Sequence, residues 1–127
     1  MENNNLTKIF ETVKENNTAL SVGSGSLKVY ATPAMIALME KASCEAVSSL
    51  LNEGETTVGT MMNVNHISAT PIGMEVYATA EVISHEGRKF VLKVEAYDEC
   101  GKIGEGMHER FLVFSEKFTE KTYSKLK

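Results

Sequence analysis

A single long amphipathic pattern dominates the first half of the chain. From Pro33 to Asn52, at 100° per residue, polar positions gather on one side and apolar positions form a stripe wide enough to face a core. This predicted stripe contains Met35, Ile36, Met39, Ala46, Val47, Leu50 and Leu51. Thr32 and Pro33 are suited to begin a helix as N-cap and first-turn proline, and residues 52–54 are suited to end it.

Alternation of apolar and polar residues, typical of β-strands, follows Gly54. It predicts strands over residues 56–68, 74–84, 90–96 and 102–118, joined by short turns that contain proline or glycine. Before the helix, residues 6–13 are expected to form a first strand, 16–25 a loop and 27–30 a short extended segment. The order is strand, long helix, then four antiparallel strands. It indicates an α+β fold in which an antiparallel sheet wraps around one helix.

Glu40 is the polar residue that fits this pattern least well. Its side chain is expected between Val47 and Leu51, inside the apolar stripe. Burying an ionised carboxylate is costly unless it is paired or hydrogen-bonded, so a lone glutamate there suggests a functional polar pocket. Alternatively, Glu40 lies at the edge of the stripe, at a subunit contact or against a backbone amide.

Two further residues could join Glu40 at such a pocket. His66 ends the strand expected at 56–68 and shares the inward face of Val64. Thr32 places a hydroxyl at the start of the helix, where free backbone N–H groups favour negative charge. The structural alternatives are a core histidine with satisfied hydrogen bonds and a plain N-cap threonine.

Composition narrows the functional classes. The chain has 127 residues, 43% of them apolar and 24% charged, as expected for one ordinary globular domain. The net charge of −4 argues against a nucleic-acid surface, and the longest apolar run, residues 34–39, is too short to span a membrane.

The N-terminus lacks the pattern of a signal peptide, so we expect a cytoplasmic protein. Cys44 and Cys100 lack metal-ligand spacing and are expected to be reduced, structural residues.

Three segments together suggest a known family. They read Ala31-Thr-Pro-Ala-Met-Ile-Ala-Leu-Met-Glu40, then Val58-Gly-Thr-Met-Met-Asn-Val-Asn-His66 running on through Ala69-Thr-Pro-Ile-Gly73, and Ile103-Gly-Glu-Gly-Met-His-Glu-Arg110. In this order, over residues 27–114, they resemble the fluoroacetyl-CoA thioesterase family of hot-dog proteins. The resemblance implies a single hot-dog domain over residues 1–127, with a long helix wrapped by five or six antiparallel strands. It also implies a homodimer with two active sites across the dimer interface, and leaves open whether dimers assemble further.

The resemblance also implies roles for individual residues. It places the catalytic threonine, glutamate and histidine on Thr32, Glu40 and His66, and substrate-binding residues on Gly59 and Arg110. Hydrolysis of an acyl-CoA needs a nucleophile or activated water, a proton shuttle and donors for the oxyanion, and no cofactor or metal is implied. Whether Glu40 or Thr32 is the nucleophile stays open. Arg110 could instead form a surface ion pair with its charged neighbours.

One departure from the family concerns substrate choice. Where the fluoroacetyl-specific enzyme has Gly-Phe after the threonine, this chain has Pro33-Ala34, and its loop at 23–27 supplies no aromatic lid. We therefore expect a short or medium acyl-CoA substrate without preference for fluoroacetyl-CoA. The alternatives are a non-catalytic protein that binds acyl-CoA or another small ligand on the same fold, and a hot-dog hydratase. The hydratase is disfavoured because its usual Asp/His pairing is not visible.

Overall fold

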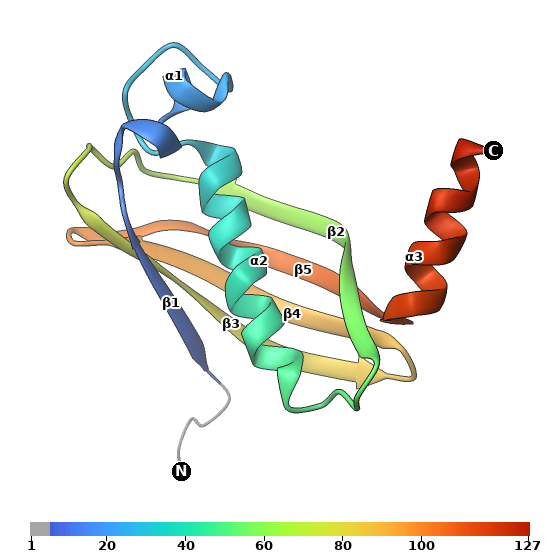
Figure 1. Cartoon of the computed structure of the whole chain (residues 1–127). Helices are drawn as coiled ribbons and strands as arrows, with labels where there is room; N and C mark the ends of the chain where they lie inside the picture. Colours follow the sequence, from blue (N-terminus) through green and yellow to red (C-terminus); the bar gives the residue numbers. More distant parts are fainter. Residues whose placement is uncertain (1–5) are drawn as a thin grey trace.

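The computed structural model describes residues 6–127, which form one sheet, one long helix and several shorter helices (Figure 1). The N-terminal part contains β1 (Thr7–Thr12), a 3₁₀ turn (Glu15–Asn17), α1 (Ala19–Val22) and α2 (Thr32–Ser48). The remaining elements are β2 (Glu55–His66), β3 (Glu75–Glu86), β4 (Lys89–Asp98), β5 (Gly101–Phe114), α3 (Ser115–Tyr123) and a 3₁₀ turn (Ser124–Leu126).

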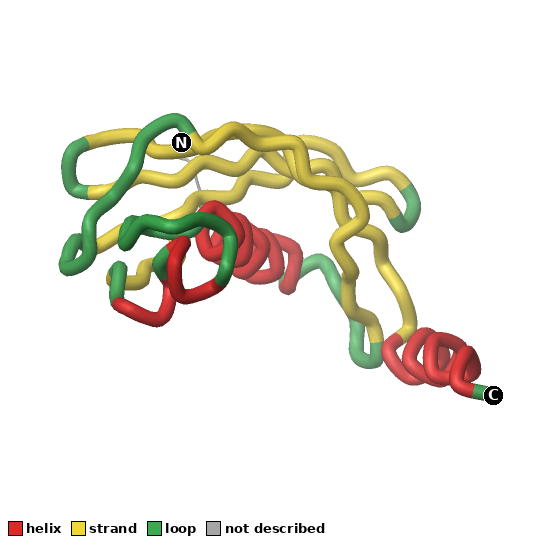
Figure 2. Tube along the Cα trace, turned by 90° about the horizontal axis from the view of Figure 1, so that it is seen from above, coloured by secondary structure: helices red, strands yellow, loops and turns green. Residues whose placement is uncertain are grey.

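The five strands form a single antiparallel sheet in the order β1-β3-β4-β5-β2. The sheet curves, and α2 lies against its concave face (Figure 2). On β4 the inward positions Phe90, Leu92, Val94 and Ala96 are fully buried, as their alternation predicts. The α+β arrangement of a sheet wrapped around one helix is therefore confirmed.

Helix α2 differs from the prediction in its end and in its buried face. It ends at Ser48, about one turn earlier than expected, so Leu50 lies beyond the helix and is 47% exposed. The buried residues are Met35, Leu38, Met39, Ala42, Ser43 and Val47. The buried face is thus rotated away from Ile36 and Leu51 towards Leu38 and Ala42, which moves Glu40 to its edge.

Strand β2 contains a β-bulge at the position that matters most for the site. Gly59 pairs with Arg110 and Met61 pairs with Glu109, so Thr60 is an extra residue on the β2 side. Bulges bend a strand, increase its twist and change the direction of side chains, often beside active sites. Here the bulge lies beside the buried side chain of Arg110.

Two segments were predicted wrongly. The expected loop at 16–25 contains the short helix α1, whose N-cap Thr18 accepts a hydrogen bond from the Ser21 amide. The last strand was expected to reach Phe118, but β5 ends at Phe114 and the chain continues as α3, which projects away from the sheet (Figure 1). α3 buries none of its residues, so local preference rather than core packing sets its conformation.

The two edges of the sheet are β1 and β2. β2 is twelve residues long and contains neither lysine nor proline, the residues that often protect an exposed edge from pairing. Of the helices that residues 6–127 form, none is long and apolar enough to cross a membrane. Cys44 and Cys100 are free and exposed, so the prediction that they are structural residues has no support from burial.

Candidate active site

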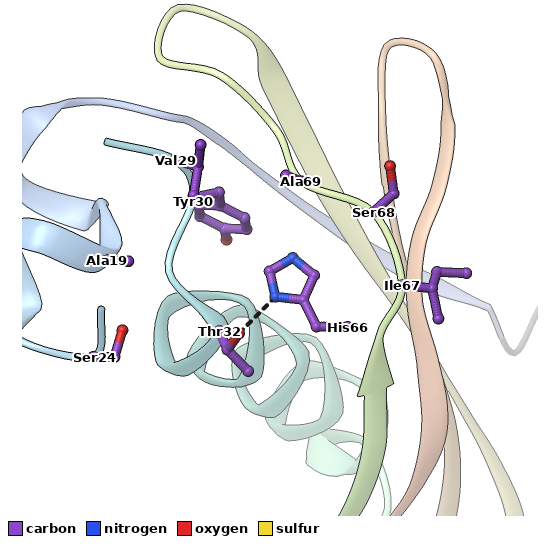
Figure 3. Close-up of a pocket in the computed structure, with 9 residues that line it drawn as sticks. All are labelled: Ala19, Ser24, Val29, Tyr30, Thr32, His66, Ile67, Ser68 and Ala69. Carbon is purple, nitrogen blue, oxygen red and sulfur yellow. Dashed lines mark hydrogen bonds between the residues drawn. The ribbon is translucent and has the colours of Figure 1, made fainter. Parts of the chain in front are cut away.

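The hydroxyl of Thr32 and the ring of His66 meet at one end of α2 (Figure 3). Oγ1 of Thr32 lies 2.7 Å from Nδ1 of His66. Thr32 is the first helical residue, and Ala31 occupies the N-cap position without a side-chain cap. The alternative that Thr32 is a plain N-cap is therefore wrong, because its hydroxyl contacts the histidine.

The second ring nitrogen of His66 has no partner. Nε2 is buried and makes no hydrogen bond to any residue in the described part of the chain, although buried polar atoms are nearly always paired. In Figure 3 this nitrogen points away from Thr32, towards Tyr30 and Ala69. The reading of His66 as a core histidine with both ring nitrogens satisfied therefore fails, because the buried Nε2 is left without a hydrogen bond.

Burial also sets the charge of this ring. Desolvation lowers the pKa of His66 below its ordinary value, and a contribution from the Ser68 backbone opposes it only in part. The neutral imidazole is then the main form near pH 7. A neutral ring can take a proton during a reaction, which is what a general base requires.

A cavity of about 300 Å³ surrounds the Thr32–His66 pair. Its size is at the lower end of the range for small-molecule sites. Towards α1 and the following loop, the wall consists of the small side chains Ala19 and Ser24. The complete lining is Ala19, Ser24, Val29, Tyr30, Thr32, His66, Ile67, Ser68 and Ala69.

Glu40 is not buried within the apolar stripe as predicted, and the alternative of a position at the edge of the stripe is the correct one. Its side chain is 44% exposed, and Oε2 lies 3.7 Å from a terminal guanidinium nitrogen of Arg110. A Cβ atom added to Gly59 would come within 2.7 Å of the same carboxylate oxygen. The carboxylate therefore reaches the backbone of β2 at the one position of the bulge that has no side chain.

Arg110 is buried, so its interpretation as a surface ion pair is wrong. Its side chain is 7% exposed. Nε donates to Thr57 Oγ1 at 2.8 Å and Nη2 donates to the Thr57 carbonyl at 3.0 Å. Nη1 lies 3.1 Å from Nε2 of His108. The guanidinium is held on three sides and turns its remaining side to Glu40.

His108 and Thr57 are members of this cluster that the sequence reasoning missed. His108 is 1% exposed and lies two residues before Arg110 on the same face of β5. Two residues at this spacing share one face of a strand, so the His-Glu-Arg segment already indicated that His108 lies beside Arg110. Thr57 gave no such signal, because threonine is common in strands.

The predicted residues thus form two groups within one chain. Thr32 and His66 make one, whereas Glu40, Gly59 and Arg110 make the other with His108 and Thr57. Among residues 6–127, no hydrogen bond or ion pair joins Glu40 to Thr32 or His66. Glu40 follows Thr32 by eight positions along α2, a rise of about 12 Å.

Comparison with known proteins identifies the class. A hot-dog-like protein from Thermanaerovibrio acidaminovorans, 24% identical, superimposes with a TM-score of 0.86 over 96% of this chain and 90% of its own, and shares the fold. A solved mutant of a fluoroacetyl-CoA-specific thioesterase, in complex with fluoroacetate and CoA, is 35% identical with a TM-score of 0.88, covering 93% of this chain and 97% of its own. The protein is therefore a thioester hydrolase with the hot-dog fold.

The family follows from the sequence matches. The profile of the family described as fluoroacetyl-CoA-specific thioesterase matches residues 13–116. The fluoroacetyl-CoA thioesterase of Streptantibioticus cattleyicolor is 43% identical over 98 residues, 77% of this chain and 70% of its own length. The chain belongs to the fluoroacetyl-CoA-specific thioesterase family.

Proposed function

We propose that this protein hydrolyses short and medium acyl-CoA thioesters, using Thr32, Glu40 and His66. The observation that carries the proposal is the Thr32–His66 pair in a cavity, with the buried Nε2 of His66 left unpaired. Relatives that act on fluoroacetyl-CoA, one of them solved with CoA, support an acyl-CoA as substrate. A protein that only binds acyl-CoA would not need a neutral histidine bonded to a hydroxyl.

Two routes to hydrolysis are compatible with the contacts. In the first, Thr32 passes its proton to Nδ1 of His66, Oγ1 attacks the carbonyl carbon, the C–S bond breaks, and the thiolate of CoA takes up a proton. Water then cleaves the threonyl ester. In the second, the carboxylate of Glu40 either attacks the carbonyl carbon itself or takes a proton from a water molecule that attacks it. The C–S bond breaks, and His66 shuttles a proton to the departing thiolate of CoA. If Glu40 attacks, water then cleaves the resulting mixed anhydride. In both, a backbone N–H at Gly59 is the proposed oxyanion donor, and Arg110 keeps the carboxylate of Glu40 oriented.

The substrate range follows from the cavity wall. Because Ala19 and Ser24 are small, nothing on that side restricts the acyl group to two carbons. We expect several short and medium acyl-CoAs to be hydrolysed with comparable kcat/KM, and fluoroacetyl-CoA to have no large advantage over acetyl-CoA. Release of CoA, followed with a thiol reagent over a panel of acyl-CoAs, measures this. A strong preference for fluoroacetyl-CoA would show that another element selects the acyl group, and binding without CoA release would favour the non-catalytic alternative.

A homodimer is part of the proposal. The long edge strand β2 is suited to pair with the same strand of a second copy, and C2 dimers are the commonest assemblies. Within one chain, Thr32 and Glu40 are about 12 Å apart along the helix. We propose that Thr32 and His66 of one protomer act together with Glu40 of its partner, so that each dimer has two shared sites.

Mixing two inactive variants tests the shared site. In a heterodimer of a Thr32→Val chain and a Glu40→Gln chain, one shared site carries both changes and the other carries neither. Random exchange of a 1:1 mixture makes half of the dimers mixed, so about one quarter of the wild-type activity should return. Each variant mixed with itself is the control. No recovery after demonstrated subunit exchange, or full activity of a monomer at micromolar concentration, would contradict this arrangement.

A cytoplasmic location completes the proposal. Cys44 and Cys100 are free thiols, the state that a reducing cytoplasm maintains. Cell fractionation with an antibody against the chain tests this, and recovery outside the cytoplasmic fraction would contradict it.

A further inference from the structure

The contacts of His108 allow only one protonation state. Its Nδ1 lies 2.8 Å from the Met61 carbonyl oxygen, which can only accept a hydrogen bond, so Nδ1 must carry a proton. Its Nε2 lies 3.1 Å from Nη1 of Arg110, which can only donate, so Nε2 must carry a lone pair. His108 is therefore a neutral imidazole in the Nδ1–H tautomer.

This tautomer provides the third anchor of the Arg110 side chain. Thr57 accepts from Nε and Nη2, and His108 accepts from Nη1, so the planar guanidinium cannot rotate without losing a bond. Nη1 has a second proton and lies 3.7 Å from the carboxylate of Glu40. This distance is too long for a hydrogen bond. Arg110 therefore acts on Glu40 through electrostatic attraction, which depends on where the guanidinium is held.

All these groups converge on the open side of Gly59. A Cβ atom there would lie 2.7 Å from Oε2 of Glu40, 3.2 Å from Cε1 of His108 and 3.4 Å from Nη1 of Arg110. Gly59 and Met61 lie on either side of the bulged residue Thr60, and the Met61 carbonyl accepts from His108. One backbone irregularity thus sets both the empty space beside the carboxylate and the anchor for the histidine.

We propose that His108 is a positioning residue: its Nδ1–H tautomer fixes Arg110, and Arg110 places the carboxylate of Glu40. The inference rests on the proposed catalytic role of Glu40 and adds a residue that does not touch substrate. A purely structural role requires only that both ring nitrogens have hydrogen-bond partners. It does not require that one of these partners be an arginine that also faces a half-exposed carboxylate.

Protonation of His108 would disrupt the arrangement. An imidazolium would turn an N–H towards the guanidinium in place of the lone pair, and would put two cations side by side. The charged groups around His108 are Arg110 and Glu109 of β5 and Glu40 of α2. Burial has the largest effect and lowers the pKa of His108, and the positive charge of Arg110 lowers it further. The hydrogen bond to the Met61 carbonyl and the two carboxylates raise this pKa, but they offset the lowering only in part.

The tautomer can be observed directly in the wild-type protein. Long-range ¹H–¹⁵N correlation of the histidine rings should show a protonated Nδ1 and an unprotonated Nε2 for His108 at pH 7. The assignment comes from the one set of ring signals that is missing in His108→Asn. An Nε2–H tautomer or an imidazolium at pH 7 would overturn the inference without any reference to activity.

Kinetics of two variants separate positioning from packing. Gln can place an acceptor near the position of Nε2, whereas Asn retains a donor for Met61 but is too short for its Oδ1 to reach the position of Nε2. We expect kcat to fall about 10- to 100-fold in His108→Asn, because misplacing a reacting group by an ångström costs up to about that much, and to recover largely in His108→Gln. KM should change little in both. His85→Asn, at an exposed histidine of β3, is the matched control and should keep full activity.

A double-mutant cycle decides through which residue His108 acts. Adding His108→Asn to Glu40→Gln should cause no further loss of kcat, because the carboxylate that His108 positions is already absent. An added loss as large as that of the single variant, or wild-type kcat in His108→Asn while Glu40→Gln is inactive, would overturn this inference and leave the proposed function intact. Full activity of Glu40→Gln would overturn the proposed role of Glu40 and this inference with it.

Discussion

Glu40→Gln should lower kcat by about 10²- to 10⁴-fold, the usual loss when one positioned acid–base group or nucleophile is removed. Gln keeps the shape of the side chain and most of its hydrogen bonds while removing the charge. Because the ion pair with Arg110 is loose and the carboxylate is half-exposed, its loss should leave the melting temperature unchanged or slightly raised. Steady-state kinetics and thermal melting of the same preparation measure the two effects.

His66→Ala should show a similar loss of kcat, and the double variant should be little worse than either single one. Groups that act in one step are not additive, since removing either already abolishes that step. If these residues served only the fold, the result would be reversed: a lower melting temperature with nearly unchanged turnover per folded molecule. Wild-type kcat in Glu40→Gln would end the catalytic claim for this residue.

Thr32→Val should also lower kcat by about 10²-fold or more, whereas Thr32→Ser should remain within about tenfold of wild type. Valine keeps the size and branching of threonine but removes the 2.7 Å contact to His66, and serine retains the hydroxyl. Because Ala31 is the N-cap residue and Thr32 makes no side-chain cap, neither change should alter the stability of α2 by much. The comparison therefore tests the hydroxyl itself.

Trapping the reaction intermediate would show which residue attacks. Rapid quenching with a slow acyl-CoA, followed by mass spectrometry of the intact chain, should detect an added acyl group if a covalent intermediate accumulates. Acylation that persists in Glu40→Gln and disappears in Thr32→Val would identify Thr32 as the nucleophile. Acylation that requires Glu40 would identify a mixed anhydride. Full activity of Thr32→Val would exclude the hydroxyl from the mechanism.

The periodicity of the chain determined most of the fold. Alternation at Phe90, Leu92, Val94 and Ala96 predicted an inward face that is fully buried, because a strand with one solvated face must alternate. The helical apolar stripe predicted α2, but the predicted C-terminal end and the predicted buried face of the helix were wrong. Which side of a helix is buried depends on the direction from which the sheet approaches, and α2 stops before Leu50 can join the stripe. α3 was not predicted, because none of its residues is buried and its sequence therefore needs no regular apolar face.

For the candidate site too, the sequence predicted the residues, and the tertiary structure decided how they are grouped. The residues Thr32, Glu40, His66, Gly59 and Arg110 were predicted from misplaced polar positions and from the resemblance of three segments to a family. Their grouping was not, because 34 residues separate the partners of the Thr32–His66 pair. The structure places Glu40 at the edge of the buried face of α2, which was the alternative to a buried position, and it buries Arg110, which excludes the alternative of a surface ion pair. It also added His108, whose protonation state depends on a carbonyl and a guanidinium that only the folded sheet brings to its two ring nitrogens.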